Sequence, residues 1–186
     1  MRPSPTAPNL LLTGRPGVGK TTVLLHVLER LPVEAAGFYT LERRRRGQRE
    51  GFDLVTIGGQ PVPMATRGAP GPSVGSYGVD IGLIDSVGVP EILRGLDEAD
   101  LLVIDEIGKM ECLSEAFRDA ALRALDSPVP VLGVIQLVKG DFADKIKARD
   151  DVSLFHVEIP NRDHLPDVLV QKLSRLFPWA ASGGGG

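Results

Sequence analysis

The segment GRPGVGKT, residues 14–21, is the feature that most restricts how this chain can fold. It matches the pattern G-x-x-x-x-G-K-[ST], follows the apolar run Asn9–Thr13 and precedes apolar residues at helical spacing. Glycines let backbone N–H groups turn inward around phosphates, and a helix N-terminus adds partial positive charge at the same point. The sequence therefore predicts a strand, loop and helix that together bind a phosphate chain.

The residue types in this loop predict separate roles toward a bound triphosphate. Lys20 is expected to reach the β- and γ-phosphate oxygens, and the hydroxyl of Thr21 is expected to be a ligand of Mg²⁺. A glycine turn that only caps a helix is the alternative, but chance matches to this spacing are rare. The residues expected to contact the nucleotide here are Gly14, Arg15, Pro16, Gly17, Val18, Gly19, Lys20, Thr21 and Thr22.

A second apolar run, residues 101–104, ends in the carboxylates Asp105 and Glu106, as expected of a Walker B element. Parallel α/β sheets bind ligands at the carboxyl ends of their strands, so we expect Asp105 to face the Mg²⁺ at Thr21. Glu106 is the candidate catalytic carboxylate, which would orient a water and partly deprotonate it. Because the strand is ending there, its side chain can lean toward the γ-phosphate.

Simpler interpretations stay open for several side chains near this run. Glu106 could instead be a solvated acid at the strand end, or an ion-pair partner of Lys109. Lys109 and Glu111 either brace the site or form an exposed pair, which would contribute well under about 1 kcal/mol to stability. Cys112 is expected to be a packed, small apolar residue rather than a nucleophile.

Short apolar runs alternate with helical patterns along the chain, which predicts an α/β fold with a mostly parallel sheet. Residues 36–46 and 49–57 flank a turn at Gly47 and Gln48, which predicts an inserted antiparallel hairpin. Residues 58–75 are half Gly or Pro and predict a long surface loop. Other strands are expected at Asn9–Thr13, 77–81, 101–105, 129–135 and 153–159, and other helices at 90–96, 111–125 and 165–176.

Length and composition bound the remaining possibilities. The chain has 186 residues, 42% of them hydrophobic and 24% charged, which fits one globular domain. We expect that domain over residues 9–178, between a flexible N-terminus at 1–8 and a flexible tail at 179–186. A net charge of −3 excludes a globally basic surface, and no apolar run reaches the roughly 18 residues of a membrane span. A single cysteine and no secretory signal favour a cytoplasmic setting.

These motifs resemble those of a family of small P-loop nucleoside-triphosphatases, which includes the cancer-related nucleoside-triphosphatase and relatives from thermophiles. The resemblance spans most of the chain and rests on LLTG at 11–14, GFYT at 37–40, GFD at 51–53, DEIGKME at 105–111 and NRD at 161–163. It implies a three-layer P-loop sandwich with an inserted hairpin. It also implies slow, Mg²⁺-dependent hydrolysis of ATP, GTP and other nucleoside triphosphates to diphosphate and phosphate, with broad base specificity.

Two positions depart from the pattern of this family. Arg15 stands where the family usually has the first proline of GPPGVGKTT, and its side chain could add a phosphate or solvent contact. Val134 follows Leu132 and Gly133 where the family tends to have Thr. A hydroxyl that could sense the γ-phosphate is therefore missing from this position.

Arginines are the candidates for stabilising charge in the transition state. Those at 43–46 and 49 lie in the predicted hairpin, where most are expected to be solvated, although Arg44 and Arg49 fall on family-like positions. Arg149 and Arg162 lie in late loops that can approach the phosphate loop, and either could serve. Asn161 is the candidate contact to the base.

Nucleoside triphosphates are the partners that we expect, with no nucleic acid and no membrane, and we expect a monomer. Two other functions stay open. One is a kinase that transfers the γ-phosphate to a small acceptor held by residues 58–75. The other is a switch, in which bound nucleotide orders the hairpin and the long loop.

Overall fold

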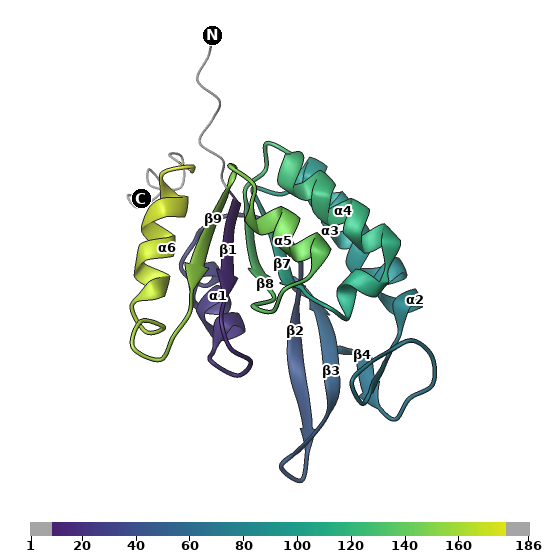
Figure 1. Cartoon of the computed structure of the whole chain (residues 1–186). Coiled ribbons are helices and arrows are strands. Elements are labelled where there is room, and N and C mark those ends of the chain that lie inside the picture. The colour runs from purple at the N-terminus through teal and green to yellow at the C-terminus, as the bar shows by residue number, and fades with distance from the viewer. Residues whose placement is uncertain (1–8, 178–186) are drawn as a thin grey trace.

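The computed structural model describes residues 9–177 as an α/β fold around one mixed sheet (Figure 1). The nine strands lie in the order β5-β6-β4-β3-β2-β7-β8-β1-β9. Their bounds are β1 Asn9–Thr13, β2 Ala35–Arg45, β3 Gln48–Thr56, β4 Val62–Arg67, β5 Ser73–Val74, β6 Tyr77–Val79, β7 Leu101–Ile107, β8 Val131–Ile135 and β9 Val152–His156. The terminal segments predicted at 1–8 and 179–186, and residue 178 of the predicted domain, lie outside the described residues.

Two groups of helices cover the two faces of the sheet, so the fold has three layers (Figure 1). Helices α1 (Lys20–Leu28) and α6 (Leu165–Ser174) pack on one face, with Leu10 and Leu12 of β1. Helices α3 (Val89–Glu98), α4 (Glu115–Asp126) and α5 (Asp141–Lys147) cover the other face, which includes Leu11. The alternation of β1 between two buried faces explains its unbroken apolar sequence. Shorter helical turns lie at α2 (Ile81–Leu83), η1 (Ile84–Gly88) and η2 (Glu111–Leu113).

The parallel part of the sheet consists of β2, β7, β8, β1 and β9. Within it, β8 lies between β1, which leads into the phosphate loop, and β7, which carries the acidic pair. The carboxyl ends of all these strands meet at one edge of the sheet, where α/β proteins bind ligands. The fold class predicted from the sequence is confirmed.

The antiparallel part contains more strands than the sequence predicts. The hairpin of β2 and β3 turns at Arg46 and Gly47 rather than at Gly47 and Gln48, and its far end extends beyond the rest of the described chain (Figure 1). The surface loop predicted at 58–75 is wrong in part, because β4 lies inside it and pairs with both β3 and β6. Pro63 is tolerated in β4 because it lies where the register with β3 shifts, at a bulge.

Several predicted boundaries also move. The helix predicted at 111–125 starts as the short turn η2, and α4 begins only after Ser114, whose hydroxyl oxygen accepts a hydrogen bond from the backbone of Phe117. The Leu101 strand continues to Ile107, past the acidic pair. Within residues 9–177, no helix is both long and apolar enough to cross a membrane.

Candidate active site

The phosphate loop connects β1 to α1 and has the conformation that its glycines allow. Gly17 and Gly19 have φ angles of 77° and 106°, in the left-handed region that other residues rarely adopt. Helix α1 begins at Lys20 with no side-chain cap, so its first N–H groups are available to an anion. The ammonium group of Lys20 lies across the loop and donates to the carbonyl oxygens of Gly14 and Arg15, both at 3.0 Å.

Asp105 reaches the start of α1 directly. The hydroxyl of Thr21 donates to its carboxylate oxygen Oδ2 at 2.5 Å, across 84 residues of sequence. Asp105 is only 2% exposed, and this burial raises the pKa of its carboxyl group to about 7. The hydrogen bond from Thr21 and the charge of Lys20 act in the opposite direction and lower the pKa, but burial is the larger effect. A carboxylate held this far from solvent favours a nearby cation.

Glu106 owes its position to a bulge in β7 rather than to the end of the strand. Asp105 pairs with Val134 and Ile107 pairs with Ile135, so Glu106 is the extra residue between two ordinary pairs. Burial raises the pKa of Glu106, and the charge of Lys20 opposes that rise. Because Lys20 acts on the pKa of both Asp105 and Glu106, both carboxylates lie near the phosphate loop.

Glu111 is a third buried acid beside this pair. It is 3% exposed, and burial followed by the charge of Glu106 raises its pKa well above the usual range. Lys109 is exposed, so the two do not form the exposed pair that the sequence left open. The pKa of the neighbouring Cys112 thiol is raised to about 12 by burial and by Glu111, which keeps it protonated and supports its expected role as a packed residue.

The loop after β9 brings Arg162 against the phosphate loop. Its guanidinium nitrogen Nη1 donates to the carbonyl oxygen of Val18 at 3.2 Å, across 144 residues of sequence. Asn161 holds the same loop in shape. Its amide oxygen accepts from the N–H of Glu158 and its amide nitrogen donates to the carbonyl oxygen of His156, both at 2.8 Å. Both polar ends of Asn161 therefore bond to the backbone of its own loop.

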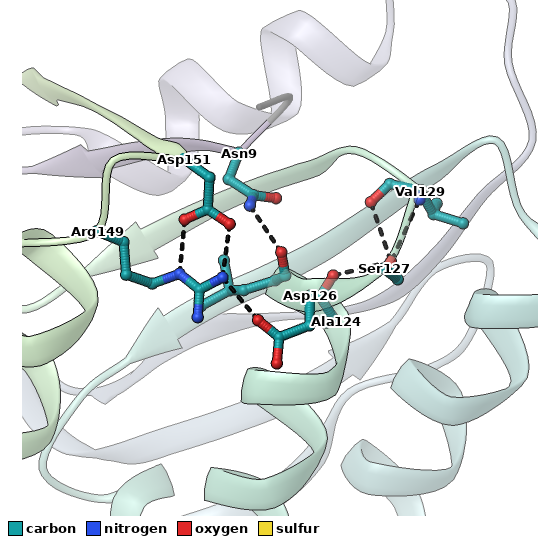
Figure 2. Close-up of polar contacts among 8 residues, drawn as sticks. Asn9, Ala124, Asp126, Ser127, Val129, Arg149 and Asp151 are labelled. Atoms are coloured by element: carbon teal, nitrogen blue, oxygen red, sulfur yellow. Dashed lines mark hydrogen bonds and ion pairs between the residues drawn. The ribbon is translucent and has the colours of Figure 1, made fainter. Parts of the chain in front are cut away.

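Arg149 does not reach the phosphate loop, contrary to the expectation that either late arginine could serve. Its guanidinium pairs with both carboxylate oxygens of Asp151, at 2.5 and 2.6 Å, and with Asp126 at 2.6 Å (Figure 2). Asp151 directly precedes β9, and Asn9 nearby is the first residue of β1. The group therefore lies at the amino ends of the strands, about 16 Å along β1 from the phosphate loop at roughly 3.3 Å per residue.

The hairpin arginines are largely paired with acids of the hairpin itself. Arg44 and Arg49 contact Glu42 at 2.5 and 2.8 Å, and Arg43 pairs with Asp53. Arg45 lies 3.7 Å from Glu50. In the sheet, β2 is separated from β1 by β7 and β8.

The residues present fit a magnesium ion bound together with a nucleotide. Mg²⁺ prefers oxygen ligands and is commonly held by one or two protein side chains plus phosphates and water. The hydroxyl of Thr21 and the carboxylate of Asp105 are such ligands, they are already adjacent, and Asp105 is a buried acid. Among residues 9–177, no group of three or more His, Cys, Asp or Glu side chains is placed to hold a metal by itself.

A glycine loop with its lysine and threonine at the start of a helix, faced by a buried aspartate two strands away, defines a P-loop nucleotide-binding protein. Comparison with known proteins narrows this class to one family. A family model described as NTPase matches residues 9–170, and the chain belongs to this family.

Curated relatives and solved structures agree with the family. The chain is 42% identical over 165 residues to the nucleoside-triphosphatase THEP1 of Thermotoga sp. strain RQ2, covering 88% of this chain and 94% of that protein. It is 40% identical over 183 residues to the human cancer-related nucleoside-triphosphatase, covering 88% and 95%. The crystal structure of THEP1 from Aquifex aeolicus superposes with a TM-score of 0.83 at 32% identity, covering 90% and 99%.

Sequence reasoning missed the burial of Glu111 and the structural use of Asn161 and Arg149. For Glu111 the only signal is its place in the DEIGKME segment, because a single acid after a strand looks the same whether buried or exposed. The partners of Asn161 and Arg149 depend on which strand end each loop joins. That choice follows from strand order, which no local pattern encodes.

Proposed function

We propose that this protein hydrolyses nucleoside triphosphates to the diphosphate and inorganic phosphate, with Mg²⁺, at a slow rate and with little discrimination between bases. The observation that carries the proposal is the hydrogen bond from Thr21 to Asp105 beside the phosphate loop. The charge of Lys20 in the same loop also acts to lower the pKa of Glu106. Proteins at about 40% identity that carry the name nucleoside-triphosphatase support it.

In this proposal the phosphate loop binds the phosphates, Asp105 helps to hold the metal ion, and Glu106 activates the water. Backbone N–H groups of residues 14–19 and the ammonium of Lys20 bind the β- and γ-phosphates, and Lys20 exchanges its loop carbonyl partners for phosphate oxygens. Thr21 and Asp105 would hold Mg²⁺, which offsets negative charge on the phosphates. Thr22 is exposed in the first turn of α1 and Arg15 is exposed in the loop, where each can contact the nucleotide or solvent.

Glu106 is the proposed general base. The oxygen of a water bonds to the γ-phosphorus, the bond from that phosphorus to the β,γ-bridging oxygen breaks, and the diphosphate leaves with this oxygen. Glu106 accepts the proton that the water loses. Its raised pKa makes it a stronger base than an exposed carboxylate, and general-base catalysis contributes about 10²- to 10⁴-fold in rate.

Arg162 is the proposed source of positive charge for the transition state, because it already contacts the phosphate loop at Val18. An arginine supplied in this way can contribute roughly 10³- to 10⁵-fold. Arg162 is 43% exposed and also lies 3.8 Å from Asp163, so it is held loosely in the free protein. A loosely held arginine is consistent with slow turnover.

Weak base discrimination is supported by the loop that also holds Arg162. Ile159 is 70% exposed there and offers apolar contact to any base, whereas both polar ends of Asn161 bond to backbone. Reading a base edge requires a free donor or acceptor. We therefore propose that Asn161 shapes the base site and that Ile159 contacts the base.

The kinase alternative receives less support. A cavity of about 520 Å³, lined in part by Pro63, Pro70 and Pro72, does lie in the segment proposed for an acceptor. It belongs to β4 and β6, however, and five strand spacings of about 4.8 Å separate β4 from β1. At about 24 Å along the sheet, an acceptor there is too far for direct transfer. A monomer in the cytoplasm, without nucleic acid, remains the setting that we propose.

Phosphate release across a panel of nucleoside triphosphates, with Mg²⁺ and with EDTA, tests the proposal. We expect release from every nucleotide, loss with EDTA and loss in Lys20→Ala. Glu106→Gln should lower kcat at least about 10²-fold while the Kd of a nonhydrolysable analogue stays within about twofold. Glu115→Gln, an exposed acid on α4, is the matched control and should behave as wild type. Turnover that survives Glu106→Gln would reject its role.

A further inference from the structure

Gln136 has a buried polar side chain that has no role in the hydrolysis proposed for Lys20, Asp105 and Glu106. It directly follows β8 and is 9% exposed. Its amide nitrogen donates to the carbonyl oxygen of Val138 at 3.2 Å, while its amide oxygen Oε1 is buried with no hydrogen-bond partner among residues 9–177. Leaving a buried acceptor unpaired destabilises the folded state. Such an atom points to a donor that comes from outside the chain.

The strand register places Gln136 between the two halves of the site. Val134 pairs with Leu12 of β1 on one side and with Asp105 of β7 on the other. Gln136 lies two residues after Val134, just beyond the end of β8, and its N–H continues the pairing with β7 by donating to the carbonyl oxygen of Ile107 at 3.2 Å. It is therefore level with Gly14, where the phosphate loop begins. Neighbouring strands lie about 4.8 Å apart, so Gln136 emerges beside the phosphate loop and beside the acidic pair.

The alternation of side chains assigns Gln136 to the face that binds the nucleotide. Leu132 and Val134 pack with the residues of α1, whereas Val131 and Ile135 pack on the opposite face. Gln136 lies four residues after Leu132 and two after Val134. Because every second side chain of an extended chain points to the same face, Gln136 is directed toward α1 as they are. Asp105, the register partner of Val134, reaches Thr21 on α1 from this same face.

Other buried, unpaired side-chain atoms in residues 9–177 do not share this position. Asn9 Oδ1 lies at the amino end of β1, and Arg49 Nε lies in the hairpin. Thr13 Oγ1 is at the carboxyl end of β1, but Thr13 has the parity of Leu11, which packs on the opposite face. Gln136 thus combines an unpaired acceptor with the correct strand end and the correct face.

We propose that Gln136 is a catalytic residue that positions the attacking water. Its amide oxygen accepts a hydrogen bond from one O–H of the water while Glu106 takes the proton of the other, and the first proton stays on the product phosphate. The bond from Nε2 to Val138 fixes the amide group and leaves its oxygen as the end that would accept from the water. This proposal rests on the proposed hydrolysis and supplies a polar contact two residues after Val134, which lacks a hydroxyl.

The test compares chemistry with ground-state binding in Gln136→Met, which keeps the length of the side chain but removes its acceptor. We expect kcat to fall by about 10²-fold. The KM and the Kd for a nonhydrolysable triphosphate should stay within about twofold, since the water is aligned only for the reaction. The Kd for diphosphate with aluminium fluoride, a mimic of the transition state, should weaken by a factor similar to that for kcat.

Asn9→Leu is the matched control, because it removes another buried amide with an unpaired oxygen, at the far end of the neighbouring strand. It should lower the Tm and leave kcat unchanged. A wild-type kcat in Gln136→Met would overturn the proposal, and so would an equal loss in kcat/KM and in triphosphate affinity, which would indicate a γ-phosphate contact instead.

Two further comparisons keep the outcome unambiguous. Should Gln136→Met be unfolded by circular dichroism, Gln136→Asn takes its place, since it retains an amide that is one methylene too short, and the same separation of kcat from Kd is required. A wild-type protein that releases no more phosphate than Lys20→Ala refutes the proposed hydrolysis itself. Hydrolysis that depends on Lys20 but not on Gln136 refutes only the role of Gln136.

Discussion

At the scale of single residues, Arg149 and Arg162 show that one residue type in two similar loops can have unrelated uses. Arg162 contacts the phosphate loop, whereas Arg149 holds Asp126 and Asp151 at the opposite edge of the sheet. We expect Arg162→Ala to lower kcat by roughly 10³-fold, the lower end for an arginine near the transition state. Phosphate release under saturating nucleotide measures this.

Arg149→Met is the counterpart of that experiment. It keeps the apolar stem and removes the ion pairs, so we expect about 1 kcal/mol of lost stability, or 2–4 °C in Tm for a chain of this size, with kcat unchanged. The reverse result, a slow but fully stable Arg149→Met protein, would show that this residue acts on the nucleotide after all.

Glu111 gives a prediction for stability against pH. Burial and the charge of Glu106 raise its pKa in the folded protein, so between its unfolded pKa near 4.5 and its folded pKa the native state binds more protons than the unfolded state. Stability from this group therefore falls as pH rises through that window. Glu111→Gln keeps an acceptor for the backbone N–H of Gly108 and carries no charge.

Thermal melts of wild type and Glu111→Gln at pH 4.5 and pH 8 measure this effect. We expect the variant to have a higher Tm at pH 8, by a few degrees or on the order of 1 kcal/mol, and a similar Tm at pH 4.5. A variant that is less stable at pH 8 would mean that the charged carboxylate has a stabilising partner and that its burial is not the dominant cause.

At the scale of elements, the close approach of β2 to β7 supports the strand that carries Asp105. Gly37 of β2 pairs with Val103 and has a φ of 112°, and a Cβ there would lie 2.0 Å from the carbonyl oxygen of Val103. We expect Gly37→Ala to cost about 3 kcal/mol or more, from the clash and the unfavourable φ together. Denaturant unfolding measures the loss.

Gly58→Ala separates these two causes. Gly58 also has a positive φ, 78°, but no atom of the described residues lies within 4 Å of the Cβ position. It should cost only about 1–2 kcal/mol, the penalty for the left-handed conformation. Equal losses in the two variants would contradict the importance of the contact with Val103.

Local patterns predicted those parts of the fold and site that depend on neighbouring residues in the sequence. The strand, glycine loop and helix at Asn9–Leu28 are such a case, and so is the apolar run that ends in Asp105. The bulge that places Glu106 and the bulge that admits Pro63 into β4 depend on the partner strand. The order that sets β8 between β1 and β7 depends on the whole sheet, which is why the position of Gln136 was not visible in the sequence.

At the scale of the whole molecule, the sheet combines two parts with different uses. The parallel part brings the loops after β1, β7, β8 and β9 to one edge, where the proposed nucleotide binds. The antiparallel part carries the arginine hairpin, whose charges are mostly matched by its own acids. Figure 1 shows the far end of this hairpin away from α1 and the loop that precedes it.

This division predicts where bound nucleotide stabilises the protein. At 100 times its Kd, a nonhydrolysable triphosphate with Mg²⁺ should add about 2.7 kcal/mol, which corresponds to a rise in Tm of roughly 5–10 °C. Among amides that exchange through local opening, the slowing should be greatest at residues 14–21, 105–111, 136–140 and 158–163, the loops that we propose to surround the ligand. Lys20→Ala should remove both effects. Protection that instead appears at the hairpin tip, residues 44–49, would favour a switch in which nucleotide orders the hairpin for a partner.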